Sequence, residues 1–98
     1  MFAINIFDDG EYEMELRNLI TFTNVAELGS FTKAAEQLGY SQSTVSFQIK
    51  QLEEELGCLL FERINHTITL TERGRELVAY SLEVRALTDK FKESLAKE

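Results

Sequence analysis

The sequence predicts a mainly α fold, with three short helices and a two-stranded hairpin followed by one long helix. Three observations support this prediction. Apolar residues recur at helical spacing through most of the chain, glycine follows each of three short helical stretches, and the sequence contains no proline. A β-branched run, Thr67 to Thr69, interrupts the helical pattern and favours strand. The chain has 98 residues and is 44% hydrophobic, enough for one domain with a modest core.

The first helix is expected to begin at about Met14. Its broad apolar face is formed by Leu16, Leu19, Ile20, Phe22, Val25 and Ala26. Gly29 supplies the left-handed conformation with which helices often end. Residues 1–13 alternate weakly between apolar and polar and then turn acidic, so we expect a flexible or loosely docked extension before this helix.

The next two helices meet across a tight turn. In SFTKAAEQLGY the shared apolar face is formed by Phe31, Ala34, Ala35 and Leu38, and Gly39 ends the helix. Ser41 is a good N-cap for the third helix, which stops at Gly57. That helix is expected to bury the stripe Val45, Ile49, Leu52 and Leu56. Two helices joined by a glycine-containing turn predict a helix-turn-helix at about residues 31–50.

The segment CLLFERINHTITLT loses the helical period. Apolar pairs on either side flank the polar centre NHT, which predicts a two-stranded hairpin, or wing, at about residues 59–70. The predicted unit is therefore a winged helix-turn-helix domain spanning residues 14–71.

A long helix is expected over residues 72–98. Thr71 is its N-cap, Glu72 lies in the first turn, and its length to about Ala96 is roughly 37 Å. A near-heptad seam is formed by Leu77, Tyr80, Val84, Leu87 and Phe91, with Leu95 beside it. A domain of this size is too small to cover such a helix, so we expect a second copy of the chain to pack on the seam.

The charge distribution bears directly on nucleic-acid binding. The formal charge of −7 runs against the basic footprint usual in such proteins. Five of the 17 acids lie in the first 15 residues, however, and no acid occurs between Gln37 and Leu52. The acidic excess is thus displaced from the third helix, although no strong basic patch replaces it.

Other classes of protein receive little support. No apolar run approaches the ~20 residues that span a bilayer, and the N-terminus lacks the basic region of a secretory signal. We therefore expect a cytoplasmic protein with no membrane partner. His66 and the distant Cys58 supply no metal-ligand set, and no nucleophile–base pair or phosphate loop is present. We expect no metal, no cofactor and no enzymatic activity.

Several motifs recur at the spacing of a known family. They are GSFTKAAEQL, SQ…VS.QI..LE.ELG, LFER and LTERG, and they fall between Glu15 and Gly74. This region resembles the N-terminal DNA-binding region of the bacterial LysR-type transcriptional regulators. The resemblance implies sequence-specific binding of operator DNA, a homodimer made through the long linker helix, and higher oligomers in a full-length regulator. It also implies a following effector domain, which lies outside these 98 residues.

Two departures from the family pattern stand out. The family usually has proline where Ser43 stands and often a basic residue where Phe47 stands. Of the wing cations usual in the family, this chain retains only Arg63. We therefore expect a weaker electrostatic hold on phosphate, and an alternative function remains: a winged-helix interaction or dimerisation module with weak or lost DNA binding.

The third helix, residues 42–56, is the expected recognition helix in the major groove, because its outer face is polar and almost uncharged. The candidate DNA contacts are Thr32, Gln42, Ser43, Thr44, Ser46, Phe47, Lys50, Arg63 and Thr67. Gln42 either pairs with adenine or only caps or solvates the start of the helix. Phe47 either packs on thymine methyl groups or folds back into the core.

Ser43 and Ser46 are also expected to meet base edges. The other candidates are expected to contact phosphate, each with an alternative. Thr32 and Thr44 contact phosphate or complete helix caps. Lys50 contacts phosphate or is an ordinary exposed lysine. Arg63 contacts phosphate or the minor groove, as Thr67 also does, or it pairs with a surface glutamate.

Overall fold

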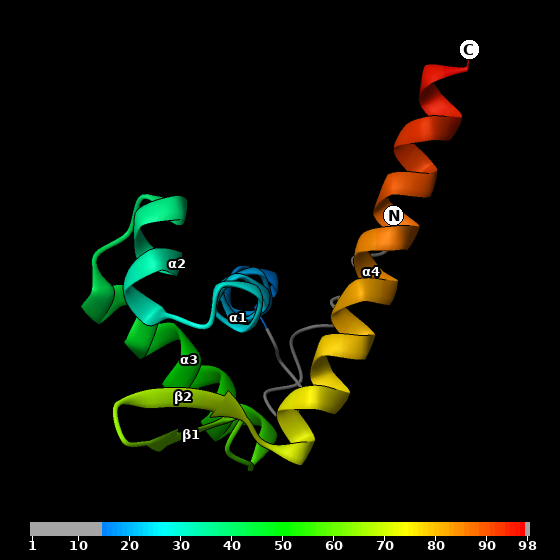
Figure 1. The fold of residues 1–98 in the computed structure, drawn as a ribbon. Coiled ribbons are helices and arrows are strands. Elements are labelled where there is room, and N and C mark those ends of the chain that lie inside the picture. The colour runs from blue at the N-terminus through cyan, green and yellow to red at the C-terminus, as the bar shows by residue number, and fades with distance from the viewer. Residues whose placement is uncertain (1–14, 98) are drawn as a thin grey trace, which may run out of the picture.

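The computed structural model describes residues 15–97. The expected extension at residues 1–13 and the expected helix start at Met14 lie outside the described residues. Four helices and one antiparallel hairpin follow in the predicted order (Figure 1). Their bounds are α1 Leu16–Leu28, α2 Phe31–Leu38, α3 Gln42–Leu56, β1 Phe61–Ile64, β2 Thr67–Leu70 and α4 Glu72–Ala96.

Side-chain caps begin three of the helices. The hydroxyls of Ser30, Ser41 and Thr71 accept hydrogen bonds from backbone N–H groups three residues later, at the starts of α2, α3 and α4. The alternative in which Thr32 caps α2 is therefore wrong, since Ser30 does so. Each short helix ends at a left-handed glycine, with φ between 64° and 75°.

The core lies where α1, α2 and α3 meet above the base of the hairpin. Its buried apolar side chains are Leu19, Phe22, Val25, Phe31, Ala34, Ala35, Val45, Ile49, Leu52 and Leu60. Three residues expected on buried faces are instead exposed. Leu16 and Ile20 are 61% and 48% exposed because they face the groove between α1 and α4, and Leu56, in the last turn of α3, is 41% exposed.

Polar side chains also join α1 to α3. The buried Thr21 hydroxyl donates to the Gln48 side-chain oxygen, and Asn18 Nδ2 donates to Gln51 Oε1 at 3.2 Å. The helical period alone did not indicate these pairs, because their residues read as polar positions facing solvent. They replace the hydrogen bonds with water that these buried groups lose on folding.

Hydrogen bonds tie the hairpin to α3 and α4. Glu53 Oε2 accepts a hydrogen bond from Leu60 N at 2.8 Å. Thr71 donates its backbone N–H to Leu60 O at 3.0 Å and its hydroxyl to Leu59 O at 2.7 Å. The base of the wing is thereby fixed against α3 on one side and α4 on the other.

The two strands pair from Phe61 with Leu70 to Ile64 with Thr67. Asn65 and His66 form the connection, with φ of 52° and 66°. Positive φ at both central positions is typical of the two-residue turns that match strand twist.

Within the described residues, α4 packs on the rest of the chain along its first half, as far as the Arg85–Glu27 ion pair with α1. Gly74 is buried against the Leu60 backbone, Ser81 is buried, and Leu77 is half-buried against the core. The expectation that Leu77 is exposed in a single copy is therefore wrong. Beyond this contact α4 projects away from the other helices (Figure 1). Among the described residues, none of the helices combines the length and hydrophobicity required to cross a membrane.

Candidate nucleic-acid interface

The outer face of α3 carries the predicted recognition residues. Gln42, Ser43 and Lys50 are exposed, and Ser46 is half-buried. Phe47 is 65% exposed, so the alternative in which it folds back into the core is wrong. The helix turns this face outward because its opposite side, with Val45, Ile49 and Leu52, packs in the core.

Hydroxyl groups cluster at the start of α3. Ser41 Oγ accepts from the Thr44 backbone N–H at 3.1 Å and lies 3.1 and 2.9 Å from the hydroxyls of Ser43 and Thr44. The cap alternative for Thr44 therefore has direct geometric support. Ser41 rather than Gln42 caps the helix, which leaves the Gln42 amide on the surface.

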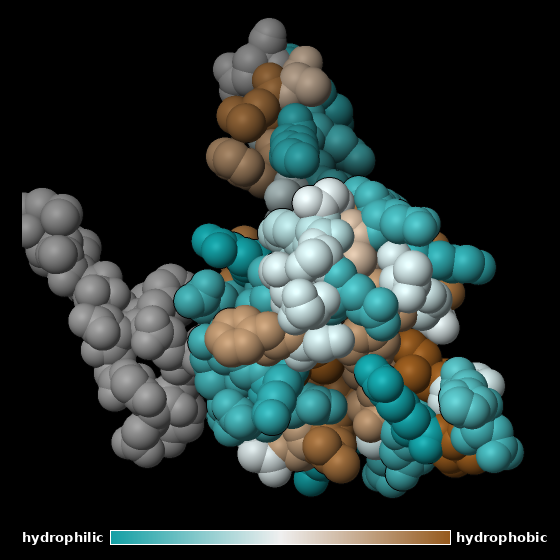
Figure 2. Space-filling model, turned by 90° about the vertical axis from the view of Figure 1, so that its left-hand side faces the viewer, coloured by the Kyte–Doolittle hydropathy of each residue, from teal (hydrophilic) through white to brown (hydrophobic). Residues whose placement is uncertain are grey.

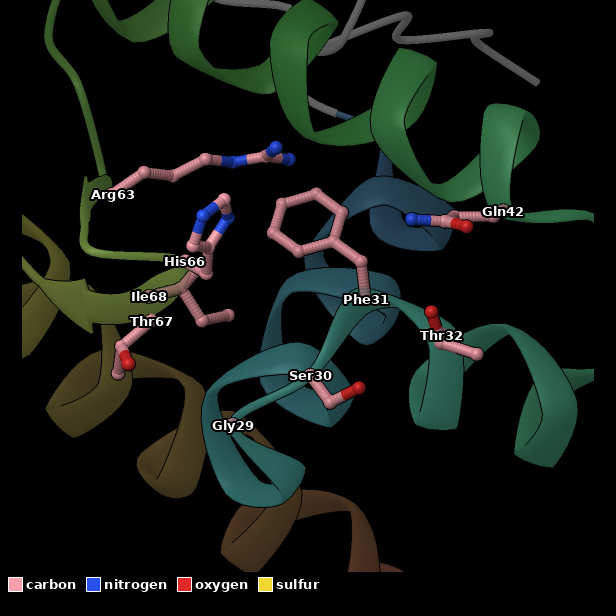
Figure 3. A pocket seen from close by; sticks show the side chains of 9 residues that line it. All are labelled: Gly29, Ser30, Phe31, Thr32, Gln42, Arg63, His66, Thr67 and Ile68. Atoms are coloured by element: carbon pink, nitrogen blue, oxygen red, sulfur yellow. The ribbon is translucent and has the colours of Figure 1, made fainter.

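A groove of about 450 Å³ separates the starts of α2 and α3 from the wing (Figure 3). It brings together four of the predicted contacts, Thr32, Gln42, Arg63 and Thr67, one each from α2, α3, β1 and β2. The N-terminus of α2 opens into this groove, where its backbone N–H groups favour an anion such as phosphate.

Arg63 lies at the centre of the arrangement. Its guanidinium carbon lies 5.0 Å from the centroid of the Phe31 ring. The ion pairs within residues 15–97 are Arg73–Glu76 and Arg85–Glu27, so Arg63 pairs with no glutamate among the described residues. A second groove, of about 260 Å³, has Ser46, Lys50 and Arg63 in its wall. Arg63 thus belongs to both grooves and links the wing to the α3 face.

The surface formed by α2, α3 and the wing is mixed in hydropathy. Figure 2 shows the side formed by α2, α3 and the wing, where hydrophilic and near-neutral residues alternate with separate hydrophobic patches. Arg73, outside both grooves, has its pKa raised by the hydrogen bond and charge of Glu76, whose Oε1 accepts at 2.8 Å. Since arginine is already protonated at neutral pH, this shift changes no charge there.

Sequence reasoning missed two residues of the groove. Phe31 was expected only in the core, yet its ring lines both grooves and contacts Arg63. His66 was considered only as a metal ligand, yet its side chain lines the larger groove (Figure 3). In the part of the chain with described coordinates, no group of three or more His, Cys, Asp and Glu residues could hold a metal ion.

A second surface lies between α1 and α4. This groove of about 330 Å³ is lined by Leu16, Ile20 and Val84 among others. The seam residues Tyr80, Leu87, Phe91 and Leu95 are exposed along α4 beside it. The predicted dimerisation residues therefore form an apolar surface, except that Leu77 packs on its own core.

Comparison with known proteins identifies related sequences. Residues 16–75 match the family model described as bacterial regulatory helix-turn-helix protein, lysR family. The uncharacterized HTH-type transcriptional regulator YwqM of Bacillus subtilis is 48% identical over 79 residues, which cover 81% of this chain and 27% of YwqM. The RuBisCO operon transcriptional regulator of Allochromatium vinosum is 50% identical over 68 residues, 69% of this chain and 22% of its own. The chain spans about a quarter of the length of these curated relatives.

Solved structures show the same fold. The BenM DNA-binding domain in complex with benA site 1 DNA has a TM-score of 0.79 and 38% identity, covering 86% of this chain and 94% of that one. The CbnR DNA-binding domain in its DNA complex has a TM-score of 0.76 and 32% identity. The match covers 86% of this chain and 97% of the CbnR chain.

Proposed function

The chain belongs to the lysR family of bacterial regulatory helix-turn-helix proteins, and we propose that it binds double-stranded DNA sequence-specifically as the DNA-binding domain of a LysR-type transcription regulator. One observation carries this proposal. Two solved domains that match 86% of the chain were crystallised with DNA, and that coverage takes in most of the described elements. The part of α3 from Gln42 to Leu52 carries no acidic residue, which agrees with it.

Each element has a distinct part in the proposed complex. The α3 helix enters the major groove, where Gln42 pairs with an adenine edge and Phe47 packs on thymine methyl groups. Ser43 and Ser46 adjoin base edges on the same face. The proposed phosphate contacts are Thr32, Thr44, Lys50, Arg63 and Thr67, with the wing also reaching the minor groove.

We propose that the active form is a homodimer in the bacterial cytoplasm. The exposed seam of α4 would be buried against a second copy, antiparallel, with help from α1. A two-fold dimer presents two α3 helices to two half-sites of an operator. Higher oligomers belong to a full-length regulator.

The test is duplex binding as a function of salt. Duplexes selected from a random pool are titrated with the 98-residue chain at several salt concentrations. We expect log K to fall linearly with log salt, with a slope of about −0.9 for each phosphate contact. Lys50→Ala should flatten this slope by about one unit per half-site.

The net charge of −7 favours one competing function, a winged-helix interaction module that has lost DNA binding. Absence of duplex binding even at low salt would support that module and contradict the proposal.

A further inference from the structure

We propose that Phe31 is a positioning residue for DNA binding, because its ring holds the Arg63 guanidinium at the interface with the nitrogen donors free. This inference rests on the proposed function and adds a residue with no expected DNA contact of its own.

The position of Phe31 is fixed by its neighbours. It is the first residue of α2, directly after the Ser30 cap, and it is 9% exposed. Phe61 packs against it with ring centroids 5.8 Å apart in an edge-on arrangement, and Phe61 in turn packs on buried Phe22 at 5.4 Å. These three rings form a rigid base that reaches from the core to the groove.

Arg63 is brought to this base by strand alternation. Side chains two residues apart on a strand lie on the same face, so Arg63 points to the side where Phe61 packs. The guanidinium carbon lies 5.0 Å from the centroid of the Phe31 ring, and Figure 3 shows the Arg63 side chain reaching toward that ring. No acidic side chain within residues 15–97 forms an ion pair with it.

The chemistry of stacking differs from that of an ion pair. A carboxylate would occupy two guanidinium N–H donors and neutralise the charge, whereas an aromatic face attracts the cation and uses no donor. The five donors of Arg63 therefore remain available for phosphate or base edges. In a chain with few cations on this surface, a preorganised arginine contributes more than a freely rotating one, because less side-chain entropy is lost on binding.

A double-mutant cycle tests this role. Affinity for a selected duplex is measured for wild type, Phe31→Leu, Arg63→Ala and the double variant. We expect Phe31→Leu to weaken binding roughly two- to fivefold, the range of a cation–π contact, and to have no effect in the Arg63→Ala background. Phe31→Tyr retains an aromatic face and should keep near wild-type affinity.

Phe22→Leu is the matched control, since it removes a ring of the same cluster that does not contact Arg63. Its effect should be the same with and without Arg63. Thermal unfolding is measured first, and Phe31→Met, with its adaptable side chain, replaces Phe31→Leu in the cycle if that variant does not fold. In the free protein, NMR should show the Arg63 side-chain signals losing their ring-current shift on replacement of Phe31.

Two failures are distinguishable. If wild type binds the duplex but the Phe31 variant weakens binding equally in both backgrounds, Phe31 has only a structural role and this inference is wrong. If wild type does not bind any selected duplex, the proposed function itself is contradicted and the inference is overturned with it.

Discussion

Phe47 exposes a large aromatic ring on an otherwise polar helix face, and two thirds of its surface is open to solvent. We expect Phe47→Ala to leave the free energy of unfolding nearly unchanged, because little contact is lost. Discrimination at one base pair per half-site should fall by about 1–3 kcal/mol as the thymine contact disappears. The measurement is competition binding with operators altered at single positions.

Controls separate this effect from others. The salt slope should be the same in Phe47→Ala as in wild type, since no phosphate contact is lost. Phe22→Ala, at a fully buried ring, should instead cost about 3–5 kcal/mol of stability. A comparable loss of stability in Phe47→Ala would contradict its placement at the interface.

The buried pair Thr21 and Gln48 leads to a second prediction at this scale. Thr21→Val removes the hydroxyl that donates to Gln48, leaving the amide oxygen buried without that donor. We expect a loss of about 1–3 kcal/mol in urea unfolding. Thr88→Val is the control, because its exposed hydroxyl bonds only to its own helix, at Val84 O. Equal costs for both variants would contradict the role of the buried pair.

Among the elements, α4 depends on one residue at its start. A Cβ at Gly74 would lie 2.2 Å from the carbonyl oxygen of Leu60, so the helix approaches the wing more closely than any larger residue allows. Gly→Ala in an unhindered helix stabilises by about 0.5–1 kcal/mol. Here we expect Gly74→Ala to destabilise by about 1–3 kcal/mol, because the backbone must shift.

The sign of the change decides this prediction. The melting temperature of Gly74→Ala is measured by thermal unfolding. A value equal to or above that of wild type would show that α4 does not pack this closely on Leu60.

Element boundaries followed well from the sequence, and individual burial followed less well. The Ser41 and Thr71 caps, the terminal glycines and the β-branched run are local signals, and they indicated the helices and the hairpin. The Ser30 cap of α2 was not predicted. The helical period alone wrongly predicted that Leu16, Ile20 and Leu56 are buried. Their burial depends on which neighbours each helix face meets in the fold. The groove between α2, α3 and the wing needed the fold, because Phe31 and Arg63 meet only in three dimensions. The roles of the candidate DNA contacts remain predictions.

On the scale of the whole molecule, α4 exposes an apolar seam that a second copy is expected to cover. Leu87, 68% exposed, lies on this seam, whereas Leu82, 50% exposed, lies about 140° away around the helix. We expect Leu87→Glu to convert a dimer to a monomer in sedimentation velocity, because a charge would be buried at the interface. Leu82→Glu should remain dimeric.

Removing α4 by truncation after Thr71 should also give a monomer. This truncation additionally exposes the core near Leu77 and Ser81, so the point variants are the cleaner comparison. A Leu87→Glu variant as dimeric as wild type would contradict the proposed seam.

The central claim is sequence-specific DNA binding by α3 and the wing. Its most direct test is the ratio of dissociation constants for a selected duplex and a scrambled duplex of equal composition, measured at one physiological salt concentration by fluorescence anisotropy. The account predicts that the selected duplex binds about a thousandfold more tightly or better. Equal affinities for the two duplexes, or no binding to either, would contradict it.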